Sequence, residues 1–179
     1  SDEAGGNFEF AAWSDDSLDR DIANWNMSDA SVDDFDAVAF ISIAAVNVER
    51  TDGTEDSLTV LLRGFDENFT NHGALSLHTW ATELCDTEAE VWNAVLNDDS
   101  LVIVDYSMTP QPTGGLDENP TLNLKVYDRI IISDPFNNGI NRTVDVVAVL
   151  TPSSSFFMNG IHINSDLAEE RFDAEPELV

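Results

Sequence analysis

Three histidines, His72, His78 and His162, are the side chains of this sequence best suited to metal binding or to proton transfer near neutral pH. No two of them have the close spacing of a zinc motif. The surrounding pattern places His72 in a turn and the other two in the middle of strands. We therefore interpret each histidine as a structural polar residue, and we predict no bound metal and no other cofactor.

Acidic side chains form a second group with chemical potential. They cluster at residues 15–21 and 52–56, where carboxylate oxygens could bind calcium or magnesium. No stretch matches an EF-hand loop. Because the chain contains 35 Asp and Glu residues, such clusters arise from composition alone, and a hydrated surface is the simpler interpretation.

The sequence carries no signature of nucleophilic catalysis. Cys85 is the only cysteine, so an internal disulfide is excluded, and no local motif marks this thiol as a nucleophile. We expect it to behave as a small buried apolar residue. The chain also lacks the GxSxG, P-loop and GxGxxG motifs. We predict that the protein is not an enzyme and has no small-molecule substrate.

The charge balance is unusual for a chain of 179 residues. The 35 acids face only 7 Lys and Arg residues, which gives a net charge of -28, and Lys125 is the only lysine. Repulsion of this size is relieved in molar salt, where the screening length is about 3 Å. The composition is similar to that of proteins from extreme halophiles and predicts a high-salt environment. An acidic protein that binds cations or basic partners in ordinary salt is the alternative. Direct binding to nucleic acid is not expected.

The elements that must position these residues are mostly strands. The run "AVAFISIAAVNVER" is apolar on both faces, but its length of about 12 residues is short of the roughly 20 that a membrane-spanning helix needs. It therefore predicts a buried central strand. The Thr87-x-x-Glu90 capping box predicts one helix over "TEAEVWNAVLNDD". Further strands are predicted in "LTVLLRGF", "GALSLHTWATEL", "LVIVDYSM", "TLNLKVYDRIIIS", "TVDVVAVL" and "FFMNGIHI".

Strands at this spacing, with turn signals between them, predict an all-β fold. We expect an antiparallel eight-stranded jelly-roll sandwich or barrel with one short inserted helix, and an immunoglobulin-like sandwich is the alternative. The predicted organisation is an acidic N-terminal arm at residues 1–34, one β-sandwich domain at residues 35–167 and an acidic C-terminal tail at residues 168–179.

Three of the seven cations fall in one predicted hairpin. They are Lys125, Arg129 and Arg142, and Tyr127 lies between the first two on the same outward face. On an acidic surface, this patch is a candidate subunit contact, where a second copy of the chain docks by charge complementarity. Ion pairing between neighbouring strands of the same chain is the alternative interpretation.

In size, composition and layout, the chain resembles the small single-jelly-roll major capsid proteins of haloarchaeal icosahedral viruses with an internal membrane. The resemblance spans about residues 36–165 as an arrangement and carries no motif, so no functional residue is transferred. It implies a structural virion protein, located in the capsid shell, that self-associates and forms capsomers with a second related capsid protein. The N-terminal arm would then contact neighbouring capsomers or the internal viral membrane.

Two other functions are compatible with the same sequence. One is a decoration or tail protein of a haloarchaeal tailed virus, or a subunit of a cell-surface assembly. The other is a small cupin-like metal-binding β-barrel enzyme that uses His78 and His162. The sequence argues against the cupin-like enzyme, because a cupin motif needs clustered His and Glu on adjacent strands. The segment "GALSLHTWATEL" supplies a single histidine.

Overall fold

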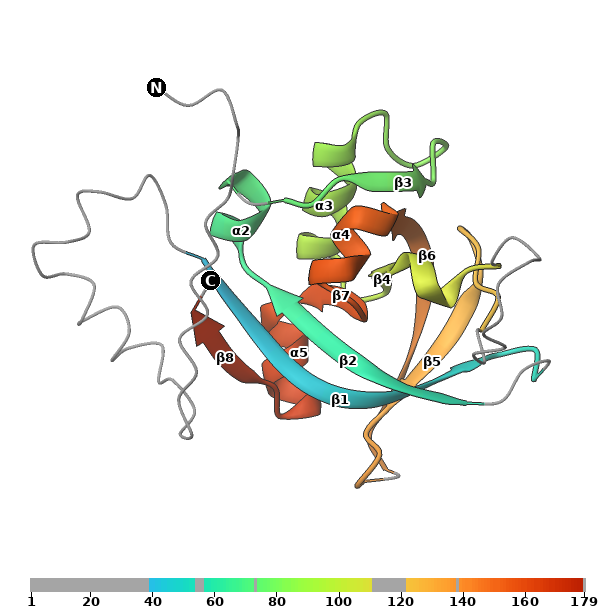
Figure 1. Ribbon diagram of the computed structural model, residues 1–179. Coiled ribbons are helices and arrows are strands. Elements are labelled where there is room, and N and C mark those ends of the chain that lie inside the picture. Colours follow the sequence, from blue (N-terminus) through green and yellow to red (C-terminus); the bar gives the residue numbers. More distant parts are fainter. Residues whose placement is uncertain (1–38, 54–56, 73, 111–121, 138, 179) are drawn as a thin grey trace, which may run out of the picture.

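The computed structural model describes residues 39–53, 57–72, 74–110, 122–137 and 139–178 (Figure 1). The predicted arm at residues 1–34 lies outside this part of the chain. Strands dominate the described residues, which confirms the prediction of a mainly β protein. Helices occur at several places, whereas the sequence indicated one.

Six strands pair in a closed ring. They follow the order β1, β2, β7, β4, β6 and β5, and β5 pairs with β1 again. The β2–β7 and β4–β6 pairings are parallel, while the remaining pairings of the ring are antiparallel, so this is a mixed barrel. The strands are β1 (Phe40–Arg50), β2 (Leu58–Phe65), β4 (Leu101–Val104), β5 (Arg129–Ser133), β6 (Asn141–Leu150) and β7 (Ile161–Asn164).

Two further strands lie outside the closed ring, and each pairs with one strand of it. β3 (Leu77–Trp80) pairs with the last residues of β6, and β8 (Glu175–Leu178) pairs with the first residues of β1. The segment predicted as an acidic tail, residues 168–179, begins within α5 (Ser165–Phe172) and includes β8.

The prediction of an antiparallel eight-stranded jelly roll is wrong. The closed ring contains parallel pairs, and it does not have the two facing sheets of the immunoglobulin-like alternative. The physical reason is that apolar alternation shows which face of a strand is buried and says nothing about which strand lies beside it. Parallel neighbours also require long crossover connections, which the sequence pattern does not reveal.

The predicted helix is present as α3 (Glu88–Asn97), and its capping box is formed. The Thr87 side chain accepts from the Glu90 backbone N–H at 3.3 Å, and the Glu90 carboxylate accepts from the Thr87 N–H at 3.3 Å. The predicted strand "FFMNGIHI" instead begins in a helix that Thr151 caps. The elements that the pattern missed are α2 (Glu67–His72), η2 (Tyr106–Met108), α4 (Pro152–Phe157) and α5.

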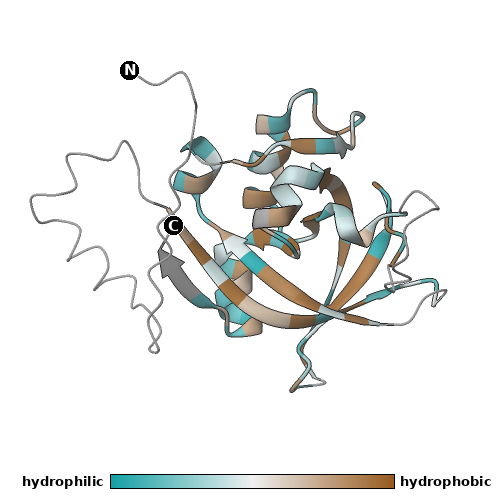
Figure 2. Ribbon diagram, in the orientation of Figure 1, coloured by the Kyte–Doolittle hydropathy of each residue, from teal (hydrophilic) through white to brown (hydrophobic). Residues whose placement is uncertain are grey.

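Apolar residues form two cores, and hydrophobic residues line the barrel strands (Figure 2). Val46 and Val48 of β1 belong to the first core together with residues of all the other ring strands and of α5. Ile41 belongs to the second core, where Trp92 of α3 packs edge-on against Phe65 with a ring-centroid separation of 4.9 Å. β1 is therefore apolar on both faces because its side chains contribute to both cores. No helix among the described residues is both long and apolar enough to cross a membrane.

Candidate functional site

Lys125 and Tyr127 lie in a turn that precedes β5, and not on a strand as predicted. Both side chains are exposed, and Tyr127 is 57% exposed. The backbone of Tyr127 has φ 76°, which is in the left-handed region. A tyrosine in this region costs of order 1–3 kcal/mol, and such strain is concentrated at functional sites. We name residues 122–128 the Tyr127 turn.

The other two cations of the predicted patch are engaged within the chain. Arg129 and Asp145 face each other across β5 and β6, and two hydrogen bonds of 2.7 and 2.9 Å join them. These bonds lower the pKa of Asp145 below its ordinary value. Arg142 contacts Asp99 at 3.5 Å. Among the described residues, Lys125 makes no ion pair. The structure thus divides the predicted patch into two paired arginines and an exposed Lys125–Tyr127 pair.

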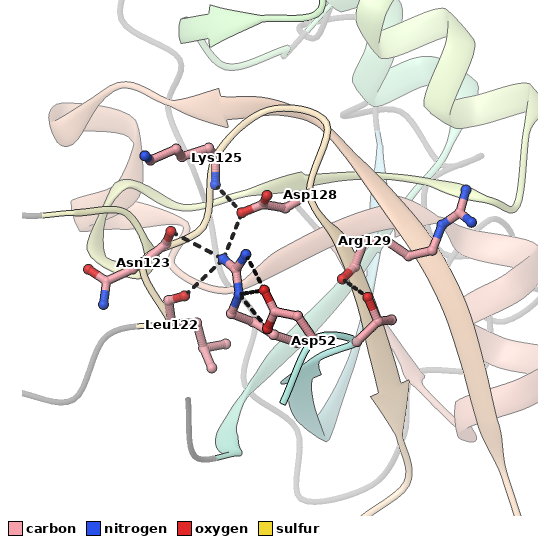
Figure 3. Close-up of polar contacts among 8 residues, drawn as sticks. Asp52, Leu122, Asn123, Lys125, Asp128 and Arg129 are labelled. Atoms are coloured by element: carbon pink, nitrogen blue, oxygen red, sulfur yellow. Dashed lines mark hydrogen bonds and ion pairs between the residues drawn. The ribbon is translucent and has the colours of Figure 1, made fainter. Parts of the chain in front are cut away.

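Arg50, at the end of β1, holds the Tyr127 turn in place. Figure 3 labels the partners of its guanidinium group, which are Asp52, Leu122, Asn123 and Asp128. Its Nη1 donates to Asp128 Oδ2 at 2.7 Å and to the carbonyl oxygens of Leu122 at 3.4 Å and Asn123 at 3.3 Å. Its Nη2 donates to Asp52 Oδ2 at 3.0 Å. Hydrogen bonds to the two carboxylates raise the pKa of Arg50 above its ordinary value. One guanidinium group therefore joins the β1–β2 connection to the Tyr127 turn.

The backbone on both sides of Tyr127 is bonded to β6. The Tyr127 N–H donates to the Val146 carbonyl at 2.8 Å, and the Val146 N–H donates to the Asp128 carbonyl at 2.8 Å. The Lys125 N–H donates to Asp128 Oδ2 at 2.9 Å. These bonds hold the strained tyrosine in place, so its ring is presented on a rigid support.

A groove of about 430 Å³ lies beside the Tyr127 turn, between it, β3 and η2. The residues that line it include four with aromatic rings and the lysine: His78, Trp80, Tyr106, Tyr127 and Lys125. The His78 and Tyr106 rings meet edge-on at 5.2 Å. Rings of this kind supply large contact areas with a polar group at one end, which is typical of binding surfaces. We call this feature the aromatic groove.

Sequence reasoning found only part of this site. It singled out Lys125 and Tyr127, and it placed His78 on a strand, with a role only as a metal ligand in the cupin-like alternative. Trp80 and Tyr106 were not assigned a role, and Arg50 was counted only as a cation. The nearby Asp52 could have suggested a local partner for Arg50. The second partner, Asp128, is 78 residues away in sequence, and no local pattern indicates it.

The two histidines of the cupin-like alternative lie in different surroundings. His162 on β7 is 1% exposed, its ring packs edge-on to Trp92 at 6.1 Å, and its nitrogens have no hydrogen-bond partner among the described residues. Burial, with a smaller contribution from the charge of Arg63, lowers the pKa of His162 to about 3. His78 is exposed in the aromatic groove. In the described part of the chain, no three His, Cys, Asp or Glu side chains are grouped so as to hold a metal ion.

Comparison with known families found no matching family model, and comparison with curated proteins found no match. Solved structures do match. One is the extracellular domain of the noncanonic ABC-type transporter YknZ from Gram-positive bacteria, with TM-score 0.55 and 12% sequence identity, over 91% of this chain and 73% of that chain. At this identity, the likeness shows the fold alone.

Two other solved structures match with TM-scores below 0.5. One is described as a permease domain from Porphyromonas gingivalis, with TM-score 0.48 and 10% identity over 80% of this chain and 54% of that chain. The other is the periplasmic region of MacB from Actinobacillus actinomycetemcomitans, with TM-score 0.44 and 17% identity over 88% of this chain and 63% of that chain.

These findings overturn the interpretation of the chain as a viral capsid protein. The resemblance was to a jelly roll, whereas the observed fold is a mixed barrel similar to a transporter's extracellular domain. Three further predictions were wrong for the same reason: the second capsid protein as partner, the contact with an internal viral membrane and the location in a virion shell. The tail-protein, surface-assembly and cupin-like alternatives are not supported. Acidic composition was misleading because net charge reports on solvent and repulsion, not on fold.

Proposed function

We propose that this chain is an extracytoplasmic domain of an ABC-type transporter permease, and that it acts as a non-catalytic binding domain. The observation that carries the proposal is the likeness to the YknZ extracellular domain, which extends over 91% of this chain. Because the match leaves out less than a tenth of the chain, it includes most of the barrel and most of the helices. The proposal therefore concerns the described domain as a whole.

The geometry of the Tyr127 turn supports the binding role. The turn presents an exposed ring and an ammonium group, and Arg50, Asp128 and Val146 hold its backbone. A preorganised surface loses little conformational entropy when a partner binds, so its contacts contribute more fully to affinity. Rigid scaffolds that carry exposed aromatic side chains are suited to recognition.

Copurification tests the assignment to a transporter. The natural full-length protein that contains this chain would be tagged, extracted in mild detergent and purified from the cells that make it. We expect an ATP-hydrolysing subunit or domain to be recovered with it in a fixed ratio, and the purified material to hydrolyse ATP. Purified full-length protein without any ATP-hydrolysing component would contradict the proposal.

A further inference from the structure

The aromatic groove differs from the rest of the surface in charge. None of the described residues that line it is acidic, although the chain contains 35 Asp and Glu residues. The only lysine of the chain, Lys125, is one of the lining residues and makes no ion pair with any described residue. A carboxylate brought to this place meets an ammonium group that pairs with no described residue, whereas acidic side chains predominate in the chain as a whole. Charge complementarity therefore favours an anionic group in the groove.

The shape and lining of the groove favour an extended peptide. Four aromatic residues line an open depression, together with the threonines at positions 79, 82 and 109. Grooves of this type accommodate extended chains, because apolar side chains or prolines pack between the rings while polar groups bond to the backbone. Trp80 is held for this role by a hydrogen bond of 3.2 Å from its indole nitrogen to the Cys85 carbonyl.

We propose that the aromatic groove binds an extended, acidic segment of a partner protein. An Asp or Glu side chain of the segment pairs with the Lys125 ammonium group, and an adjacent apolar residue or proline packs against Trp80 and Tyr127. The net charge of -28 opposes binding of an acidic segment over much of the surface, which favours this site over others. This inference can fail or succeed independently of the transporter proposal, because peptide binding is measured on the isolated chain.

The test is a screen of random linear peptides, displayed on phage, against the full immobilised chain at one fixed salt concentration. We expect the recovered peptides to be enriched in Asp and Glu beside apolar residues or proline. Synthetic copies should bind to the wild type and should bind about tenfold or more weakly to Lys125→Glu, since the loss of one charge pair of about 1.4 kcal/mol corresponds to tenfold in affinity.

Arg171→Glu is the matched control. It makes the same change in net charge at an exposed residue of α5 that is not among the described lining residues of the groove. We expect it to weaken binding much less than Lys125→Glu. Equal losses in the two variants would show that only total charge matters and would overturn the proposal. Recovery of basic peptides, or of none, would also overturn it.

A second copy of the chain is the competing occupant. Light scattering during size-exclusion chromatography separates the two cases. We expect wild type and Lys125→Glu to have the same mass. A wild-type dimer that Lys125→Glu converts to a monomer would assign the groove to self-association and would contradict the peptide proposal.

Discussion

Arg50 and Asp128 are 78 residues apart in the sequence, and their side chains are joined by a hydrogen bond of 2.7 Å between Nη1 and Oδ2. This ion pair connects the end of β1 to the Tyr127 turn, and both side chains are largely shielded from solvent, with exposures of 17% and 24%. The same guanidinium group reaches two backbone carbonyls of the turn. The presentation of Lys125 and Tyr127 therefore depends on a residue that belongs to neither the turn nor the groove.

Replacement of Arg50 by Met should lower the free energy of unfolding by about 2–3 kcal/mol, because it leaves Asp128 and two carbonyl groups without a charged donor. The measurement is urea denaturation followed by circular dichroism. Arg142→Met is the control, since Arg142 contacts a more exposed carboxylate at 3.5 Å, and a change of about 0–1 kcal/mol is expected there. Equal changes in the two variants would argue against a special role for Arg50.

Tyr127→Gly tests whether the backbone of Tyr127 is strained in the folded protein. Glycine adopts a φ of 76° without strain, so relief of about 1 kcal/mol offsets the greater chain entropy of glycine and the lost ring contacts. We expect the free energy of unfolding to stay within about 1 kcal/mol of the wild type. Tyr127→Ala keeps the strain and should be less stable than Tyr127→Gly in the same denaturation experiment. The reverse order would show that the tyrosine backbone is not strained.

His162 should make stability dependent on pH. Its pKa is about 3 in the folded protein against 6.5 ordinarily. The unfolded chain therefore takes up a proton as the pH falls below about 6.5, while the folded chain stays neutral until about pH 3. The stabilisation is complete above pH 6.5 and decreases through this window with a slope of about 1.4 kcal/mol per pH unit from this one group.

His162→Leu isolates that contribution from the carboxylates, which also titrate in acid. Free energies of unfolding would be measured for wild type and variant at a series of pH values between these limits. We expect the wild type to lose stability relative to the variant as the pH is lowered, because leucine binds no proton in either state. Parallel curves for the two proteins would show that His162 is protonated equally in the folded and unfolded chains.

Salt should stabilise the fold. At net charge -28, self-repulsion acts over a screening length of about 30 Å in 10 mM salt and about 3 Å in 1 M salt. We expect the free energy of unfolding to increase through a sodium chloride series. Chloride is the suitable anion because sulfate would also strengthen apolar burial. A stability that is unchanged or falls along this series would mean that repulsion does not limit the folded state.

Local patterns predicted the individual elements and not their arrangement. The Thr87–Glu90 capping box located α3 because its signal lies within four residues. The two apolar faces of β1 indicated a buried strand, and two cores account for them. In contrast, "LNLKVYD" alternates like a strand but forms a turn. Its conformation is set by Arg50 and by Val146, which are distant in sequence.

The candidate site, too, could be predicted only in part from the sequence. Lys125 and Tyr127 were identifiable because a lone lysine and an outward-facing tyrosine are conspicuous in an acidic chain. The aromatic groove was not identifiable, because β3, η2 and the Tyr127 turn come from separate parts of the sequence and meet only in the folded barrel. The order of strands in the closed ring, with its parallel pairs, decided this geometry.

Labelling in intact cells is the most direct test of the proposed extracytoplasmic placement. Phe136, which is 93% exposed, would be replaced by Cys in the natural full-length protein, in a Cys85→Ser background that serves alone as the control. A small membrane-impermeant maleimide would be applied to intact and to lysed cells. We predict equal labelling of the Phe136→Cys protein in both. Labelling that appears only after lysis would contradict the placement of this domain outside the cytoplasm.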